Sequence, residues 1–161
     1  MSNQVPLQIP LSVDVRGNAR FENFLAQGNE LAIASLQATA RGEGEYFTYL
    51  WGSIGAGVSH LLKASSHLAE SLGRSTEYLR LDQQNGFCLA QLEKYAQVDL
   101  LCLDNLQEIA GNAQWEEAIF HLFNERRDKG LGLIIAANAA PRHVHIHLAD
   151  LSSRLSWGMA F

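Results

Sequence analysis

The sequence lacks the features of a membrane or secreted protein. No apolar run in its 161 residues approaches the ~20 residues that a transmembrane helix needs. The first ten residues, Met1 to Pro10, lack the basic and then apolar layout of a secretion signal. We therefore expect no association with a membrane.

Cysteine is scarce, and positive charge is not in excess. The only two cysteines, Cys88 and Cys102, have no metal-ligand spacing, which favours small buried side chains in a reducing cytoplasm. The formal net charge is −5, and an acidic domain is repelled by nucleic-acid phosphates. We therefore predict a cytoplasmic protein that does not bind DNA directly.

The composition, with 47% hydrophobic and 18% charged residues, suits one globular domain. Prolines at positions 6 and 10 predict that residues 1–20 form a flexible arm, so residues 21–161 would carry the folded core. In that core, strand-like segments alternate with helical ones, which implies parallel pairing. We therefore predict an α/β fold, a three-layer αβα sandwich with a parallel sheet.

The expected elements follow from apolar periodicity and from glycine and proline breaks. Asn29 is the expected N-cap of the first clear helix, which ends near Gly42. Residues 157–161 resemble the opening of a further apolar strand, so we expect a sheet truncated in its final strand. The other expected strands are 46–51, 76–81, 98–103 and 131–137, and the other expected helices are 58–72, 87–95, 115–129 and 149–155.

A glycine-rich turn joins the first expected strand to the next helix. It matches the phosphate-binding pattern G-x-x-x-x-G-K-[ST], whose backbone N–H groups converge on an anion, except that Val58 replaces the lysine. Losing a hydrogen bond from a charged group, worth roughly 1.5–3 kcal/mol, weakens binding on the order of 10–100-fold. Weak binding of ADP or ATP and a packed turn that binds nothing both stay open. The residues of the turn are Gly52, Ser53, Ile54, Gly55, Ala56, Gly57, Val58 and Ser59.

Asp104 follows the apolar run 100–103 and is the acidic residue expected at the end of a buried strand, where it would hold Mg²⁺ with Ser59. Many ATPases place a second carboxylate next, to orient the attacking water. Here Asn105 follows, and an amide cannot act as a base. The pairing of the turn with Asp104 is more specific than either feature alone, and it predicts a nucleotide site with little hydrolysis of its own.

Three alternating histidines, His143, His145 and His147, would share a face of an extended strand and suggest zinc. No cysteine completes a ligand set, and Asp150 is the only nearby carboxylate. We therefore predict solvated histidines in a loop.

Several longer runs resemble the DnaA/Hda group of AAA+ proteins, the family of the bacterial replication initiators. The likeness extends in order from about Phe21 to the C-terminus. The runs are Ser59-His60-Leu61-Leu62, DNLQEIAG at 104–111, WEEAIFHLFN at 115–124, Pro141-Arg142, and LADLSSRLSWG at 148–158, which is similar to the arginine-bearing box of the family.

The resemblance implies an AAA+ nucleotide-binding core with His60 in the nucleotide site and Asn138 at the sensor position after the fourth strand. Within the group, the chain is more similar to the Hda type, the regulatory inactivator of DnaA, because the initiator's N-terminal domain and the loop lysine are missing. The C-terminal helical lid is expected to be absent too. The resemblance also implies that Arg154 is an arginine finger, which reaches ATP held by a neighbouring subunit.

The N-terminal arm is similar to the peptide by which Hda binds the DNA sliding clamp. One register starts at Gln4, with Leu7 and Ile9 as anchors, and a register over 6–11 fits equally well. The implied partners are the sliding clamp and a DnaA-type initiator, and the implied function is negative regulation of replication initiation through hydrolysis of DnaA-bound ATP. An inert interaction module and a weak nucleotide-switch ATPase stay open as alternatives. A homo-oligomer also stays open, because an interrupted final strand exposes a sheet edge.

Overall fold

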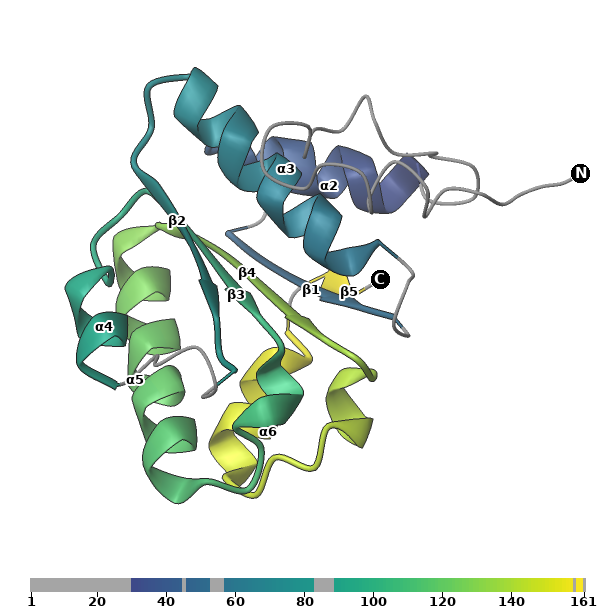
Figure 1. Cartoon of the computed structure of the whole chain (residues 1–161), viewed down its shortest axis with the longest axis vertical. Helices are drawn as coiled ribbons and strands as arrows, with labels where there is room; N and C mark the ends of the chain where they lie inside the picture. Colours follow the sequence, from purple (N-terminus) through teal and green to yellow (C-terminus); the bar gives the residue numbers. More distant parts are fainter. Residues whose placement is uncertain (1–29, 45, 53–56, 83–88, 158, 161) are drawn as a thin grey trace, which may run out of the picture.

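The structure, a computed structural model, describes residues 30–44, 46–52, 57–82, 89–157 and 159–160. Its middle layer is a five-stranded sheet in the order β2-β3-β4-β1-β5, and every pairing is parallel (Figure 1). The predicted α/β class and parallel sheet are therefore confirmed. The strands are β1 (Phe47–Trp51), β2 (Thr76–Arg80), β3 (Leu100–Asp104), β4 (Gly132–Ala137) and β5 (Met159–Ala160).

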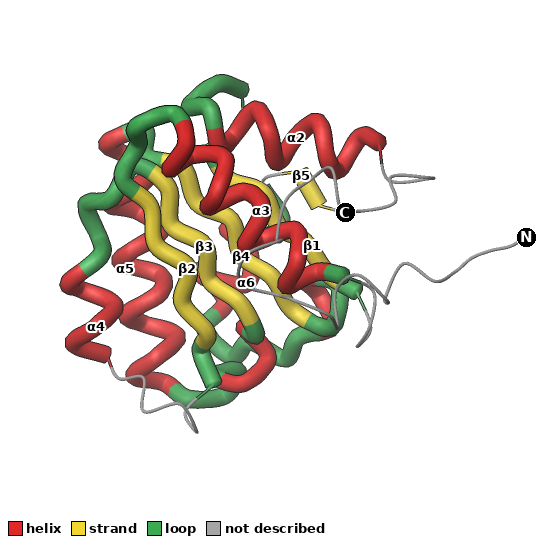
Figure 2. The backbone as a smooth tube through the Cα atoms, turned by 45° about the horizontal axis from the view of Figure 1, so that its top comes forward, coloured by secondary structure: helices red, strands yellow, loops and turns green. Residues whose placement is uncertain are grey.

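Helices cover both faces of the sheet and make the outer layers (Figure 2). Helices α2 (Glu30–Ala40) and α3 (Val58–Ser71) lie on one face. Helices α4 (Leu89–Lys94), α5 (Ala113–Lys129) and α6 (Ala149–Leu155) lie on the other. No described helix is both long enough and apolar enough to cross a membrane.

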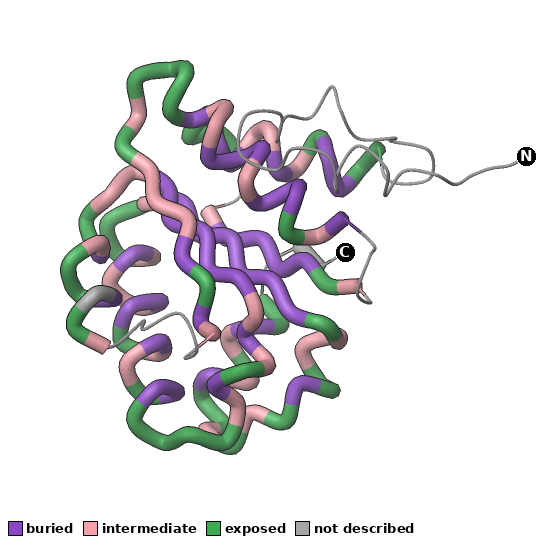
Figure 3. The backbone as a smooth tube through the Cα atoms, in the orientation of Figure 1, coloured by how far each residue is buried: buried purple, intermediate pink, exposed green. Residues whose placement is uncertain are grey.

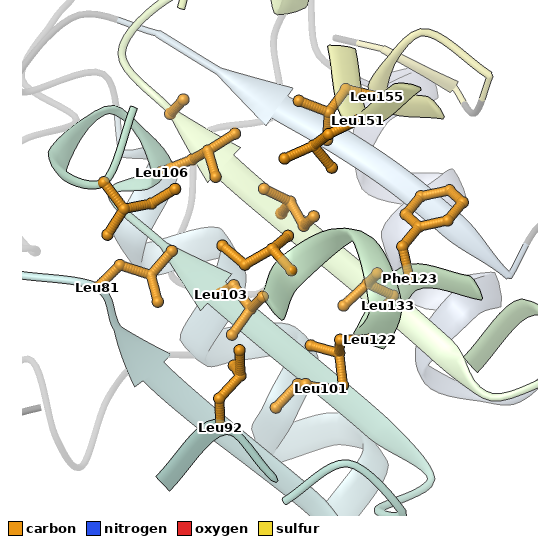
Figure 4. Close-up of a cluster of buried hydrophobic side chains, with 14 of the residues drawn as sticks. Leu81, Leu92, Leu101, Leu103, Leu106, Leu122, Phe123, Leu133, Leu151 and Leu155 are labelled. Atoms are coloured by element: carbon orange, nitrogen blue, oxygen red, sulfur yellow. The ribbon is translucent and has the colours of Figure 1, made fainter. Parts of the chain in front are cut away.

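Strands β3 and β4 are buried along their whole length (Figure 3). Their side chains alternate between two apolar clusters, as the period of a strand requires. Leu101 and Leu103 face α5 and α6 in the larger cluster (Figure 4), whereas Leu100 and Cys102 face α2 and α3 in the smaller one. Burial on two faces explains why both strands are nearly continuous apolar runs.

Element boundaries differ from the prediction by one or two residues. Helix α5 begins at Ala113 rather than Trp115, because Asn112 is its N-cap and accepts hydrogen bonds from Gln114 N–H (3.1 Å) and Trp115 N–H (3.2 Å). The expected strand opening near the C-terminus is present as β5, which pairs with β1. Asn29, the expected cap of α2, lies outside the described residues.

Two short 3-10 helices in the described part of the chain were not predicted. They are η4 (Leu106–Glu108) and η5 (Pro141–His143), and each follows a central strand of the sheet. Both are only three residues long, so neither contains enough apolar positions to show a helical period.

Candidate functional site

The N-terminus of α3 lies next to the carboxyl end of β1. Gly57 precedes the helix with a φ of 87°, in the left-handed region that glycine enters without strain, and no side chain caps this end. The first intrahelical bond runs from Leu61 N–H to Gly57 O (3.0 Å), so the N–H groups at the start of α3 have no partner within the helix. Such groups favour an anion. The other predicted loop residues Ser53, Ile54, Gly55 and Ala56 lie outside the described residues.

Asp104 ends β3 and meets the start of α3. The Ser59 hydroxyl donates to Asp104 Oδ2 over 2.5 Å, and Asn105 N–H donates to Oδ1 over 2.9 Å. The carboxylate is almost fully buried, yet no described lysine, arginine or histidine lies within salt-bridge distance of it. The structure therefore joins the two oxygen ligands that the sequence predicts for Mg²⁺.

Tyr78 on β2 is a third described donor to Asp104, and the sequence analysis did not predict this contact. Its hydroxyl donates to Asp104 Oδ2 over 2.5 Å. Burial raises the pKa of the Tyr78 phenol, and the charge of Asp104 raises it further. Because the phenol stays protonated, it remains a donor to the carboxylate. Tyr78 and Asp104 lie on adjacent strands 26 residues apart, so only the pairing of β2 with β3 brings them together.

Two cations lie near this carboxylate without pairing with it. Lys63, one helical turn after Ser59 on α3, places its Nζ 5.3 Å from the centre of the Tyr78 ring. Burial lowers the pKa of Lys63, the charge of Asp104 raises it, and the charge of Arg80 lowers it. Arg80 ends β2 in register with Asp104 and forms an exposed salt bridge with Asp82 (3.5 Å).

Val58 and Asn105 occupy the positions that lack the expected charged groups. The Val58 side chain packs against the smaller apolar cluster under α3. Asn105 follows β3 with a φ of 67°, a left-handed conformation that asparagine tolerates better than most residues. Its amide has no basic oxygen to deprotonate water, so the position directly after Asp104 supplies no base.

The carboxyl ends of β1, β4 and β3 are adjacent in the sheet, and ligands of open parallel sheets bind at such an edge. Asn138 follows β4 there, is exposed, and donates its N–H to Gln107 Oε1 over 3.2 Å. His60, in the first turn of α3, is buried. The roles predicted for Asn138 and His60 in binding a nucleotide stay predictions.

Arg154 lies on α6, on the face of the sheet opposite α3. Its Nε donates to Asn124 Oδ1 over 3.2 Å, and its guanidinium carbon stands 4.1 Å from the centre of the Trp157 ring and 5.5 Å from that of Phe120. No described carboxylate lies within salt-bridge distance of Arg154, and neither Nη donates to a described residue. The guanidinium is therefore oriented by rings and one amide oxygen while its charge stays unneutralised.

Glu116 holds the segment that leads into α6, a role that the sequence analysis missed. Its buried carboxylate accepts from Gly111 N–H (2.6 Å), from His147 N–H (3.1 Å) and from Leu148 N–H (2.8 Å). Leu148 is the N-cap of α6 and its own side chain caps nothing, so Glu116 on α5 provides the acceptor for the N–H of this N-cap residue. A signal was available, because Glu116 is at helical spacing from the buried Ile119 and Phe123.

The three histidines predicted to be solvated are exposed. His143 belongs to η5, His145 is left-handed with a φ of 68°, and His147 precedes α6. No described strand includes them, so the shared face on which a zinc site depends does not form.

Comparison with known proteins places this geometry in a family. The bacterial DnaA ATPase domain family matches residues 16–161, nearly the whole chain. The chain belongs to this family. It is a DnaA-like AAA+ domain, from a group associated with the initiation of DNA replication.

The chain spans only part of the length of each of three similar proteins. An uncharacterized protein of Haemophilus influenzae is 39% identical over 152 residues, which is 94% of this chain but 66% of that protein. The replication initiator DnaA bound to AMPPCP and single-stranded DNA is 26% identical with a TM-score of 0.80, over 91% of this chain and 50% of that one. Domain III of Thermotoga maritima DnaA is 25% identical with a TM-score of 0.76, and the match covers 92% of this chain and 68% of that one.

Proposed function

We propose that this chain is a negative regulator of replication initiation that promotes hydrolysis of ATP held by a DnaA-type initiator, acting together with the DNA sliding clamp. The active site would be composite. The initiator supplies the nucleotide and its metal, and this chain supplies Arg154 across the interface. An arginine presented in this way stabilises the charge that spreads over the transferred phosphoryl group in the transition state.

The environment of Arg154 is the observation that carries the proposal. An arginine that serves only the fold is normally paired with a carboxylate or with carbonyl groups, as Arg126 is with three carbonyl oxygens. Arg154 instead has Trp157 and Phe120 beside it and one amide oxygen on Nε. Its two Nη groups are left for an acceptor on another molecule, and the planar fork suits phosphate oxygens.

The chain's own nucleotide site supports a second, weaker role. Ser59 and Asp104 offer hydroxyl and carboxylate oxygens, which Mg²⁺ prefers, and the start of α3 offers N–H groups for phosphates. Bound Mg²⁺ would neutralise phosphate charge. A related DnaA binds AMPPCP. We infer that this chain binds ADP or ATP weakly and, with Asn105 after Asp104, hydrolyses little of it.

The decisive experiment is a hydrolysis assay with a DnaA-type initiator preloaded with ATP, clamp-loaded DNA and this chain. We expect the chain to accelerate hydrolysis and Arg154→Ala to remove on the order of 10³-fold of that acceleration, as for other arginine fingers. Arg127→Ala is the matched control, because Arg127 also lies beside Trp157, at 5.9 Å, yet is paired with Asp128. If the Arg154→Ala variant accelerates ATP hydrolysis as much as the unmodified chain does, the proposed mechanism is wrong.

A pull-down with the sliding clamp tests the arm, whose residues Gln4, Leu7 and Ile9 lie outside the described part of the chain. We expect a Leu7→Ala, Ile9→Ala double variant to lose clamp binding in a pull-down, while Arg154→Ala keeps it. If the unmodified chain binds initiator and clamp but never accelerates hydrolysis, the alternative of an inert interaction module replaces the proposal. If it hydrolyses ATP without the initiator, the nucleotide-switch alternative does.

A further inference from the structure

Lys63 has a setting unlike that of an ordinary surface lysine. It lies four residues after Ser59 on α3, and side chains at this spacing share one face of a helix. Its ammonium lies beside the Tyr78 ring, 5.3 Å from the ring centre. The hydroxyl of the same ring donates to Asp104, which Ser59 also contacts. Lys63 therefore lies beside the pair of groups that would hold Mg²⁺.

The ammonium of Lys63 is partly buried and lacks an acceptor. No described carboxylate lies within salt-bridge distance of Nζ, and Nζ donates to no described oxygen. A lysine has three N–H donors, and partial burial removes some of the water that would satisfy them. Burial lowers the pKa of this group while the charge of Asp104 opposes that effect, as expected of a cation held near an anionic site.

The loop position that normally provides a lysine is occupied by Val58, whose side chain packs into the apolar cluster under α3. We propose that Lys63 supplies, from the β2 side of the site, the positive charge toward the phosphates of a nucleotide that Val58 lacks. Tyr78 is then a positioning residue, because its ring holds the ammonium and its hydroxyl holds the Asp104 carboxylate. The proposal rests on nucleotide binding by this chain itself and is independent of Arg154.

The test is calorimetric titration of Mg²⁺–ADP into the full chain. We expect measurable binding by the unmodified chain and about 10–100-fold weaker binding by Lys63→Gln, the loss expected for one hydrogen bond from a charged donor. Lys63→Arg keeps the charge and should retain most of the affinity. Lys94→Gln is the matched control, since Lys94 lies over the Tyr95 ring at a similar 5.6 Å but on α4, across the sheet from α3. It should bind as the unmodified chain does.

A rescue experiment separates charge from folding. Placing the lysine back in the loop, as Val58→Lys in the Lys63→Gln background, should restore affinity if the missing charge is the cause. Equal losses in Lys63→Gln and Lys63→Arg without rescue would show a structural role and overturn the proposal. So would a Lys63→Gln affinity within about twofold of the original. If the unmodified chain does not bind Mg²⁺–ADP, this inference fails, while the assay on Arg154 still decides the proposed function.

Discussion

At the scale of single residues, two ionisable side chains of the sheet, Cys102 and Tyr49, are buried and form no described salt bridge. Cys102 in the middle of β3 is fully buried, and burial raises the pKa of its thiol, with a further rise from Asp104 that Arg126 opposes. Burial likewise raises the pKa of the Tyr49 phenol. These groups stay protonated in the folded protein at pH values where the unfolded chain loses its protons.

Because the pKa of Cys102 is raised, we predict that the free energy of unfolding falls in mild alkali. Because its folded pKa is raised, its contribution is fully present below the unfolded value of about 8.5 and is lost as the pH rises. The free energy of unfolding should fall by about 1.4 kcal/mol per pH unit above that value. Urea unfolding between about pH 8 and 10, in a Cys88→Ser background that leaves Cys102 as the one thiol, measures the slope.

The matching variant is Cys102→Ala in the same background. It should be less stable at pH 7 because it leaves a small cavity, yet its stability should change little over the interval in which the thiol titrates. If the free energy of unfolding falls equally steeply with pH in the two proteins, Cys102 does not cause the loss of stability in alkali.

At the scale of elements, the position of α6 depends on a contact made from α5. Helix α6 spans seven residues and has no side-chain cap of its own. The Glu116 carboxylate replaces the missing cap, since it accepts hydrogen bonds from the N–H groups of His147 and Leu148. An anion at this end of a helix is favourable, because unpaired N–H groups and the helix dipole both attract it. The orientation of Arg154 therefore depends on a residue that does not touch it.

We predict that Glu116→Gln loosens α6 without unfolding the sheet. The amide offers one acceptor oxygen and turns an NH₂ toward N–H donors, so it should cost about 1–3 kcal/mol in the free energy of unfolding. Amide hydrogen exchange should accelerate at residues 147 and 148. Glu117→Gln is the control, because Glu117 is adjacent but exposed, and it should change neither quantity by much. Unchanged exchange at both amides in Glu116→Gln would contradict the capping role.

At the scale of the whole molecule, one buried arginine joins the helical layer to the sheet. Arg126 on α5 is fully buried and donates to the carbonyls of Ala96 (2.7 Å) and Val98 (2.6 Å) before β3, and of Gly132 (2.7 Å) in β4. These carbonyls lie near the amino ends of two central strands, where the ladder leaves acceptors unpaired. The residue links three segments that are distant in sequence.

Arg126→Met should therefore destabilise the whole domain rather than one helix. Three carbonyls, two of them in buried contacts, would lose a charged donor. We expect a cost on the order of 3–5 kcal/mol, measured as the free energy of urea unfolding. Arg127→Met is the neighbouring control, since Arg127 is partly exposed, forms a salt bridge with the exposed Asp128 and lies beside the Trp157 ring rather than binding buried carbonyls. Surface pairs of that kind contribute about 0–1 kcal/mol. Similar stabilities for the two variants would refute the role of Arg126.

The sequence predicted the sheet well because strands buried on both faces are apolar throughout, as β3 and β4 are. The sequence also predicted that Ser59 and Asp104 lie together, because parallel strands bring their carboxyl ends to one edge of the sheet. It did not predict Tyr78, Lys63 or Glu116. Their partners lie on other helices and strands. One amino-acid sequence does not show which residues of different elements meet, because such contacts depend on strand register and helix rotation.

The Glu116 contacts also bear on how this region can change in evolution. The carboxylate takes only backbone N–H groups from the segment before α6, so the exposed His147 can be replaced by almost any residue without loss of the contact. Proline is excluded there, because it has no N–H to donate. Selection on the position of α6 would therefore act on the side chain of Glu116 and only on the backbone of residue 147.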